Sequence, residues 1–342
     1  SRSGSRSGSK GNTAWKRLSH VNRMGNDHSA QIVEPKDCSD EASWCSRVQQ
    51  RTLNELWAIP ATHNSACVSS RSTNPFWIWA KNQAADLWTQ LSMGVRVFDL
   101  RLCDDAGDGL VWVSHTMVSS VTLQSSLEVF ADFLRWQPSE FIMVQLSRDF
   151  NRSFADPGAI EALLAERRFR LPAFEPHGLD TLVGDLAGGL IVVSPHFPDC
   201  CPEMWPEDLF EGPGLVPMWR WRSPHEAKCR VDEHVLSGQH LVTSKGQLTG
   251  VVLDGSFHWL PPSAWAQHMQ EWLLSRIEGV WAPQMSRLGV VAVDYASPEF
   301  CARLLAGAPR DCGASDGTCA GEGPATGICH VGSSRGGQQK VA

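Results

Sequence analysis

Three short apolar runs in the first third of the chain end on polar side chains, and they constrain the fold. Residues 56–65 read Leu-Trp-Ala-Ile-Pro-Ala-Thr-His-Asn-Ser, residues 94–101 read Gly-Val-Arg-Val-Phe-Asp-Leu-Arg, and residues 110–116 read Leu-Val-Trp-Val-Ser-His-Thr. A strand that ends on a titratable residue presents that side chain at the rim of a sheet, where α/β folds assemble their sites. We therefore expect His63, His115 and the end of the middle run to contribute to one site.

Strand-like runs alternate with helical patterns through the body of the chain. Residues 110–114 predict a strand, residues 122–137 an amphipathic helix and residues 140–147 the next strand, so that the three form a β-α-β unit. Residues 264–277 predict another amphipathic helix. Further strands are predicted at residues 189–194, 240–244, 249–253 and 288–294. This alternation favours a parallel sheet covered by helices, closed or open, and our first choice is a single-domain α/β fold, a distorted or incomplete TIM-type β/α barrel.

Composition divides the chain into a body, residues 37–306, and two tails. Residues 1–36 are rich in Ser, Arg and Gly, and the first 24 residues carry six basic and no acidic side chains. Residues 307–342 are rich in Gly, Ser and Cys. We predict that both tails are disordered. The basic arm would also suit anionic lipid or nucleic acid, but an inert tail is preferred, and neither a nucleic-acid nor a protein partner is predicted.

Several classes of protein are disfavoured by what the sequence lacks. No run approaches the roughly 20 apolar residues of a membrane span, and no secretory leader is evident, so we expect a soluble chain whose membrane contact is peripheral. The first residue is not Met, which leaves the compartment unknown. No Gly-rich phosphate loop is present, and the C-terminal cysteines lack the paired spacing of a zinc site.

Two histidines and an arginine at neighbouring strand ends suit one kind of chemistry. An imidazole can take or give a proton near neutrality, so a pair on opposite sides of a reacting centre can act as base and acid. The guanidinium of Arg101 would supply fixed positive charge. This set suits phosphoryl transfer, in which charge spreads over the phosphate oxygens, and it needs no bound metal in principle.

The three runs resemble the signatures of a known family. Ile-Pro-Ala-Thr-His-Asn-Ser is similar to the first motif of the phosphatidylinositol-specific phospholipase C X domain, and Gly-Val-Arg-Val-Phe-Asp-Leu-Arg to the second. Val-Ser-His-Thr, followed by a helix and Gln-Pro-Ser-Glu-Phe-Ile-Met-Val-Gln-Leu, resembles the third. Order and spacing match over residues 50–150 and fade afterwards. The resemblance implies an incomplete or distorted β/α barrel that cleaves phosphatidylinositol, or a related phospholipid, into diacylglycerol and a cyclic inositol phosphate.

The resemblance also implies roles for individual residues. His63 would be the general base, and His115 the general acid that protonates the leaving glycerol oxygen. Arg101 would stabilise the charge on the phosphorane, and Asp294 would orient His63 as a carboxylate orients the base of a triad. Asn64, Asp99, Arg148 and His196 would contact substrate, although the second half of the chain lacks clear counterparts of the family residues that hold the inositol ring.

Metal use depends on three positions. The eukaryotic members hold calcium with an Asn after the first His and with acids in the second motif, whereas the bacterial members place an Arg there. This chain has Asn64 and Asp99 but also Arg101, and so mixes the two patterns. We favour the form without a cofactor, because a guanidinium repels a cation and calcium requires six or more oxygen ligands. If calcium were used, Asn64 and Asp99 would be its ligands.

Residues 74–79, Asn-Pro-Phe-Trp-Ile-Trp, follow the first histidine where the bacterial members carry a short helix that enters the lipid interface. Phe76, Trp77 and Trp79 would contact a phospholipid membrane surface. The alternative is that these aromatic residues pack beneath the rim of the barrel.

Two other functions remain open at the level of sequence. The barrel could keep its shape and bind lipid without turnover, or it could cleave glycerophosphodiesters or sphingophospholipids. The complete set of His63, His115 and Arg101 favours a phospholipase over a binding module, because a scaffold has no physical need for all three.

Overall fold

The computed structural model describes residues 40–104, 108–149, 152–166, 171, 180–194, 197, 224–237, 250–253, 261–282, 284 and 287–306. The predicted tails, the predicted strand at residues 240–244 and His196 lie outside these ranges, and the predicted division into tails and body stays a prediction. The strands are β1 (Ala58–Thr62), β2 (Val97–Cys103), β3 (Trp112–His115), β4 (Met117–Thr122), β5 (Ile142–Arg148), β6 (Leu190–Val193), β7 (Gly250–Leu253) and β8 (Gly289–Val293). The α-helices are α2 (Trp77–Ala80), α3 (Leu87–Ser92), α4 (Leu123–Trp136), α5 (Pro157–Ala165), α6 (Pro224–Leu236), α7 (Pro262–Arg276) and α8 (Pro298–Ala306). The remaining helical segments are η2 (Asp40–Arg47), η3 (Leu53–Glu55), η5 (Val183–Leu186) and η8 (Ile277–Trp281).

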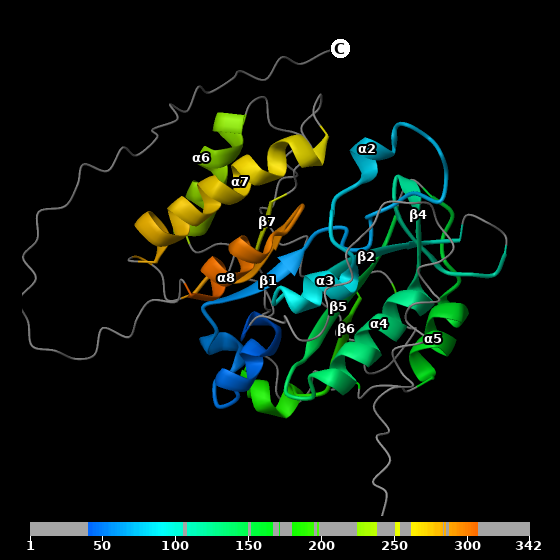
Figure 1. Ribbon diagram of the computed structural model, residues 1–342, viewed down its shortest axis with the longest axis horizontal. Helices are drawn as coiled ribbons and strands as arrows, with labels where there is room; N and C mark the ends of the chain where they lie inside the picture. Colours follow the sequence, from blue (N-terminus) through cyan, green and yellow to red (C-terminus); the bar gives the residue numbers. More distant parts are fainter. Residues whose placement is uncertain are drawn as a thin grey trace, which may run out of the picture. The chain divides into compact units, whose positions relative to one another are not determined.

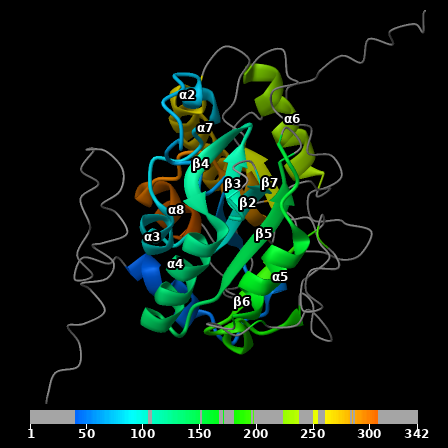
Figure 2. The ribbon, with the colours of Figure 1, turned by 90° about the vertical axis from the view of Figure 1, so that its right-hand side faces the viewer.

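Six strands form a parallel sheet in the order β6-β5-β2-β1-β8-β7. β1 is central and joins the early strands to the late ones, pairing with β2 on one side and β8 on the other. Helices alternate with these strands, and α3 and α4 lie side by side, as do α7 and α8 (Figure 1). Figure 2, turned by 90° from Figure 1, shows β2, β5 and β6 with α5 beside them. Among the described strands no pairing joins β6 to β7, so the order is that of a β/α barrel left open there.

A β-hairpin interrupts the parallel order, and here the predicted β-α-β unit was wrong. β3 pairs with β2 in the antiparallel sense and turns directly into β4, while β5 pairs with β2 instead of β3. The parallel crossover therefore runs from β2 through α4 to β5, with the hairpin inserted before the helix. The sequence pattern identified β3 and β5 as strands, but it carried no information on which strands pair.

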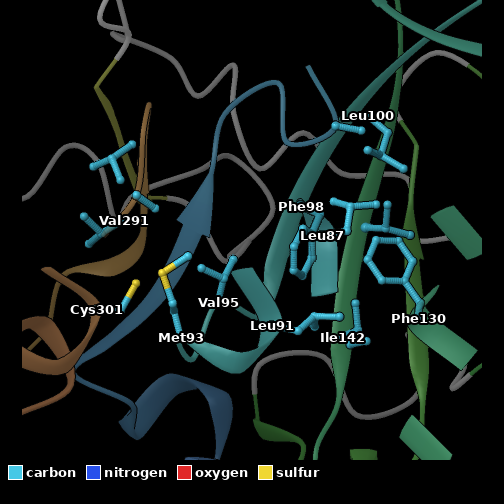
Figure 3. Packing of buried hydrophobic residues seen from close by; sticks show 14 of the residues in the cluster. Leu87, Leu91, Met93, Val95, Phe98, Leu100, Phe130, Ile142, Val291 and Cys301 are labelled. Atoms are coloured by element: carbon cyan, nitrogen blue, oxygen red, sulfur yellow. The ribbon is translucent and has the colours of Figure 1, made fainter. Parts of the chain in front are cut away.

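The inner and outer faces of the sheet bury different sets of residues. Paired residues of a parallel sheet point to the same face, and the row that contains Ala61, Val97, Met143, Ile191 and Ala292 packs into one apolar cluster. The alternate residues pack outward against the helices. Figure 3 shows this outer layer, in which the rings of Phe98 and Phe130 lie 5.0 Å apart. The inner face is thus apolar at depth, which leaves its carboxyl-end positions for polar residues.

The predicted helix at residues 122–137 is confirmed as α4, and its core face is the one expected. Thr122 caps the helix by accepting a hydrogen bond from the Ser125 amide. The apolar residues at spacings of three and four are all buried: Leu123, Leu127, Phe130 and Leu134. None of the helices in the described ranges combines the length and apolar character needed to cross a bilayer.

Candidate active site

The predicted site residues meet where the parallel strands end. His63 follows β1, Asp294 follows β8, and Asp99 and Arg101 lie on β2. Each continues the inward-facing row of its strand: His63, Asp294 and Asp99 lie two residues beyond Ala61, Ala292 and Val97, and Arg101 lies two residues beyond Asp99. The apolar cluster of the inner face therefore lies beneath them, and the carboxyl-end rim presents them together, as in other β/α barrels.

The His63 imidazole is buried and hydrogen-bonded on both sides. Its Nδ1 lies 3.0 Å from Oδ1 of Asp294. Because a carboxylate only accepts, Nδ1 carries the proton and Nε2 presents its lone pair. Arg101 Nη2 lies 2.9 Å and Asn64 Nδ2 3.0 Å from that Nε2. The geometry fits a base whose tautomer is fixed by a carboxylate and whose reactive nitrogen faces a guanidinium.

His115 faces His63 from the end of β3. The two ring centroids are 6.1 Å apart, and the planes are inclined by 67°. His115 Nδ1 lies 3.3 Å from the Ala80 carbonyl oxygen, which can only accept, so Nδ1 is the donor and Nε2 is the nitrogen available for the predicted proton transfer. The two rings lie at the distance of an edge-to-face contact, so the predicted base and the predicted acid stand side by side at the rim.

The Asp99 side chain joins β2 to the turn that follows β1. Its Oδ2 accepts a hydrogen bond from the backbone N–H of Asn64 at 3.1 Å and lies 3.5 Å from Nε of Arg101. Ser147 Oγ donates to its Oδ1 at 3.3 Å. This buried carboxylate thus fixes the orientation of Arg101, whose side chain is 31% exposed and reaches the rim.

Backbone strain marks the three predicted proton-handling residues. All described non-glycine residues with positive φ directly follow one of them: Asn64 (46°) follows His63, Thr116 (61°) follows His115, and Tyr295 (52°) follows Asp294. Such a conformation is uncommon, above all for Thr and Tyr, and persists only where surrounding contacts impose it. Thr116 is held by Asp149, whose Oδ2 accepts its amide at 2.7 Å, and by Arg152, which donates to its carbonyl at 2.8 Å.

Buried amide side chains support these turns, and no sequence motif pointed to them. Gln83 Nε2 donates to the carbonyls of His63 and Val293 at 2.9 and 3.0 Å. Gln270 Nε2 donates to the carbonyls of Asp294 and Tyr295 at 2.7 and 2.9 Å. These hydrogen bonds satisfy backbone carbonyl groups at the points where the chain leaves β1 and β8 and turns.

Arg148 does not join the central group. The β2–β5 register pairs it with Leu102, whereas Arg101 pairs with Ser147. Its guanidinium stacks on the ring of Phe154 at 5.0 Å. Arg148 therefore lies at the rim on the outer face of the sheet. Ser147, its neighbour on β5, contacts Asp99. His196 falls outside the described residues.

Two groups beside the site are kept neutral. Burial and the nearby Asp99 carboxylate raise the pKa of the Cys67 thiol well above its usual value. Burial also raises the pKa of Tyr295, with a smaller contribution from Asp294. Neither group can supply an anionic nucleophile near neutral pH.

The residues at the rim do not fit a calcium ion. Asn64 Oδ1 is buried without a hydrogen-bond partner and could serve as one ligand. The Asp99 carboxylate, however, is already engaged by the Asn64 amide, Ser147 and the Arg101 guanidinium. No group of three or more His, Cys, Asp or Glu in the described ranges is arranged to hold a metal. Calcium requires several anionic or carbonyl oxygens, whereas this position carries a fixed cation.

The predicted membrane segment forms α2 and the turn before it. Phe76, Ile78 and Trp79 are 65%, 48% and 42% exposed, and the rings of Phe76 and Trp79 lie 5.9 Å apart. Trp77 differs from the prediction, because its indole packs against the hydrophobic core and its Nε1 is buried. The outward face is therefore Phe76, Ile78 and Trp79.

Comparison with known proteins agrees with this geometry. Residues 58–157 match the family described as "Phosphatidylinositol-specific phospholipase C, X domain". The 1-phosphatidylinositol phosphodiesterases of Staphylococcus aureus strains Newman and NCTC 8325 / PS 47 are each 29% identical over 153 residues, which is 43% of this chain and 47% and 44% of theirs. The chain thus spans about half the length of these curated relatives.

Solved structures show that the fold is shared. The phosphatidylinositol-specific phospholipase C from Listeria monocytogenes superposes with a TM-score of 0.61 at 16% identity, over 78% of this chain and 98% of that one. The enzyme from S. aureus does so with a TM-score of 0.59 at 18% identity, over 78% and 97%. The predicted distorted TIM-type barrel is confirmed. So is the resemblance predicted from the three motifs: residues 58–157 are similar to the X domain of phosphatidylinositol-specific phospholipase C, on a fold shared with two bacterial enzymes of that name.

Proposed function

We propose that this protein is a phospholipase C-type phosphodiesterase that cleaves phosphatidylinositol or a closely related phospholipid. One observation carries the proposal: two imidazoles face each other at 6.1 Å, one of them bonded to a carboxylate on Nδ1 and to a guanidinium on Nε2. A lipid-binding scaffold gains nothing from burying His63, Asp294 and Asp99 together, since even paired ionisable groups often contribute less stability than apolar residues of similar volume.

The geometry supports a displacement with two proton transfers. His63 Nε2 accepts the proton of the inositol 2-hydroxyl, whose oxygen attacks phosphorus. His115 Nε2 gives a proton to the glycerol oxygen as the phosphorus–oxygen bond to glycerol breaks. The products are diacylglycerol and a cyclic inositol phosphate; His63 has gained the proton of the 2-hydroxyl, and His115, protonated at the start, has lost one to glycerol. Arg101 lies beside the base, where negative charge develops on the phosphoryl oxygens.

Arg101 and Asp294 prepare His63 in different ways. Asp294 holds the proton on Nδ1, so that Nε2 is the nitrogen directed at substrate. Arg101 donates to Nε2 in the absence of substrate, and a phosphate anion at the rim would attract this guanidinium away from the base. Substrate binding would thereby free the lone pair of His63 at the moment when it is needed.

We expect turnover without a metal, because Arg101 takes the position where calcium would otherwise act. Phosphorus NMR with phosphatidylinositol vesicles should show a cyclic phosphodiester product in the presence of chelator, and added calcium should not increase its rate. His63→Ala should abolish the signal in both conditions. A signal only with calcium would overturn metal independence and assign Asn64 and Asp99 to the metal.

The same experiment separates the alternative functions. Vesicle binding without product would favour the lipid-binding module, whereas product from glycerophosphodiesters or sphingophospholipids alone would reassign the substrate. Either result would refute the proposed substrate while leaving the geometry of the site as described.

We also propose that Phe76, Ile78 and Trp79 contact the lipid surface. These side chains are contiguous, exposed and apolar, and Lys81 follows them. An aromatic pair beside a cation is typical of segments at the headgroup level of a bilayer. The segment precedes the Ala80 carbonyl that bonds His115, so a membrane that buries this face lies next to the site.

The variant Phe76→Ala/Trp79→Ala should bind phosphatidylinositol vesicles more weakly by at least about tenfold, because burial of each large apolar side chain contributes roughly 1.5–3 kcal/mol. Turnover of a short-chain, monomeric phosphatidylinositol should be unchanged. Sedimentation with vesicles measures binding, and Leu236→Ala is the matched control. Leu236 is 43% exposed and ends α6, a helix far along the chain from residues 76–79. Equal losses in both variants would contradict this membrane surface.

A further inference from the structure

A four-residue segment, Ala80 to Gln83, contacts all three proton-handling residues. The Ala80 carbonyl lies 3.3 Å from His115 Nδ1. Asn82 Nδ2 donates to Asp294 Oδ1 at 3.0 Å, and Gln83 Nε2 donates to the His63 carbonyl at 2.9 Å. We refer to residues 80–83 as the strap. Motif resemblance gave no indication of it, because it lies between the first two motifs.

The second half of the strap, Asn82 and Gln83, is itself fixed to the barrel from two sides. The amides of Asn82 and Gln83 donate to the Cys67 carbonyl at 3.1 and 3.4 Å. The Tyr295 amide donates to the Asn82 carbonyl at 2.7 Å, and the Ala296 amide to Gln83 Oε1 at 3.2 Å. It therefore ties the turn after β1 to the turn after β8, which are the two turns that carry His63 and Asp294.

We propose that the strap is a positioning element of the active site and that Asn82 is the positioning residue for the His63–Asp294 pair. The proposal rests on the proposed function, because it concerns the base and the acid of that reaction. Asn82 contacts no substrate atom in this scheme and acts through Asp294.

The bonding of Asp294 supports this role. Its Oδ1 accepts two N–H groups, from His63 Nδ1 and from Asn82 Nδ2, each at 3.0 Å. Both side chains are buried, so water does not replace a lost donor at low cost. The second donor holds the carboxylate oxygen in place and shares its charge. Without Asn82, Asp294 would interact more strongly with His63 and would favour its protonated form.

A buried amide side chain with a purely structural role should respond differently to substitution, and Gln90 is such a residue. Gln90 is also fully buried, and its Nε2 donates to the carbonyls of Ser65 and Ala85 at 2.8 and 2.7 Å. Its Oε1 accepts from Thr62 Oγ1. It contacts no side chain of the three proton-handling residues, so it matches Asn82 in burial and bonding but not in role.

The test compares Asn82→Ala, Asn82→Asp and Gln90→Leu in the full-length protein. We expect Asn82→Ala to lower kcat by about 10- to 100-fold with little change in KM, the usual loss for a residue that orients a reacting group. The acid limb of its kcat/KM profile should move to higher pH. Asn82→Asp conserves shape but sets two carboxylates side by side, which cannot both ionise, and should lose more activity. Gln90→Leu should unfold at a lower temperature but keep the wild-type pH profile.

Proton NMR provides a readout that needs no turnover. The His63 Nδ1 proton, bonded to a carboxylate, should resonate at low field in the wild type and disappear in His63→Ala. Its titration should shift in Asn82→Ala and stay unchanged in Gln90→Leu. If the wild type failed to cleave lipid, this titration would still test the strap. If Asn82→Ala kept the wild-type kcat, pH profile and low-field signal, the positioning role would be refuted.

Discussion

Replacing His115 by Ala should abolish most activity on phosphatidylinositol but little on a substrate whose leaving group needs no proton. General acid catalysis contributes about 10²- to 10⁴-fold, and a glycerol alkoxide is a poor leaving group without it. An inositol phosphodiester with a nitrophenol in place of diacylglycerol releases a stabilised phenolate. We therefore expect His115→Ala to recover most of the wild-type rate on that substrate.

His63→Ala should behave in the opposite way. The base acts on the attacking hydroxyl, whose chemistry is the same in both substrates, so the loss should be similar with either leaving group. Release of nitrophenol, followed by its absorbance, measures one substrate, and phosphorus NMR measures the other. His225→Ala, a change of an exposed histidine on α6, should leave both rates unaltered. Equal losses for His115→Ala on the two substrates would mean that His115 is not the acid.

The structure brings His63, Asp99 and Arg101 to one rim, as the apolar runs predicted, because each stands at or near the carboxyl end of a parallel strand. The motif resemblance singled out these side chains, and their catalytic roles stay predictions. Asp294 was the least local prediction, since it is 231 residues from His63, and it was found only from a second strand end. Strand pairing was not accessible in this way, and for that reason the β3–β4 hairpin was read as part of a β-α-β unit.

The supporting residues could not be predicted for a different physical reason. Asn82, Gln83 and Gln270 occupy a loop or a helix, where amide side chains are usually exposed. Their function depends on backbone acceptors that come from distant turns, so no local pattern distinguishes them from solvated residues. The positive φ angles of Thr116 and Tyr295 could not be predicted from the sequence either, because neither residue type favours that conformation.

A buried ion pair at the opposite end of β2 from Arg101 joins η2 to the barrel. Arg96 and Glu140 are both fully buried, and Nη2 of Arg96 lies 2.8 Å from Oε2 of Glu140. Arg96 also donates to the carbonyls of Ala42, Leu91 and Val95, and Glu140 accepts from the amides of Cys45 and Ser46. The pair thus fixes η2, the turn before β2 and the entry to β5 at once.

Arg96→Met should lower the free energy of unfolding by about 3–5 kcal/mol, because it leaves Glu140 as an uncompensated buried charge. Glu140→Leu should cost a similar amount, and the double variant should lose less than the sum, since it removes both charges. Equilibrium unfolding in urea measures each value. Arg303→Met is the control, because the Arg303–Glu278 pair is 41% and 47% exposed and should contribute about 1 kcal/mol or less. Strict additivity in the double variant would show that the two side chains stabilise the fold independently. Under conditions where they remain folded, all these variants should keep the pH profile of the wild type, because the pair lies at the end of β2 away from the imidazoles.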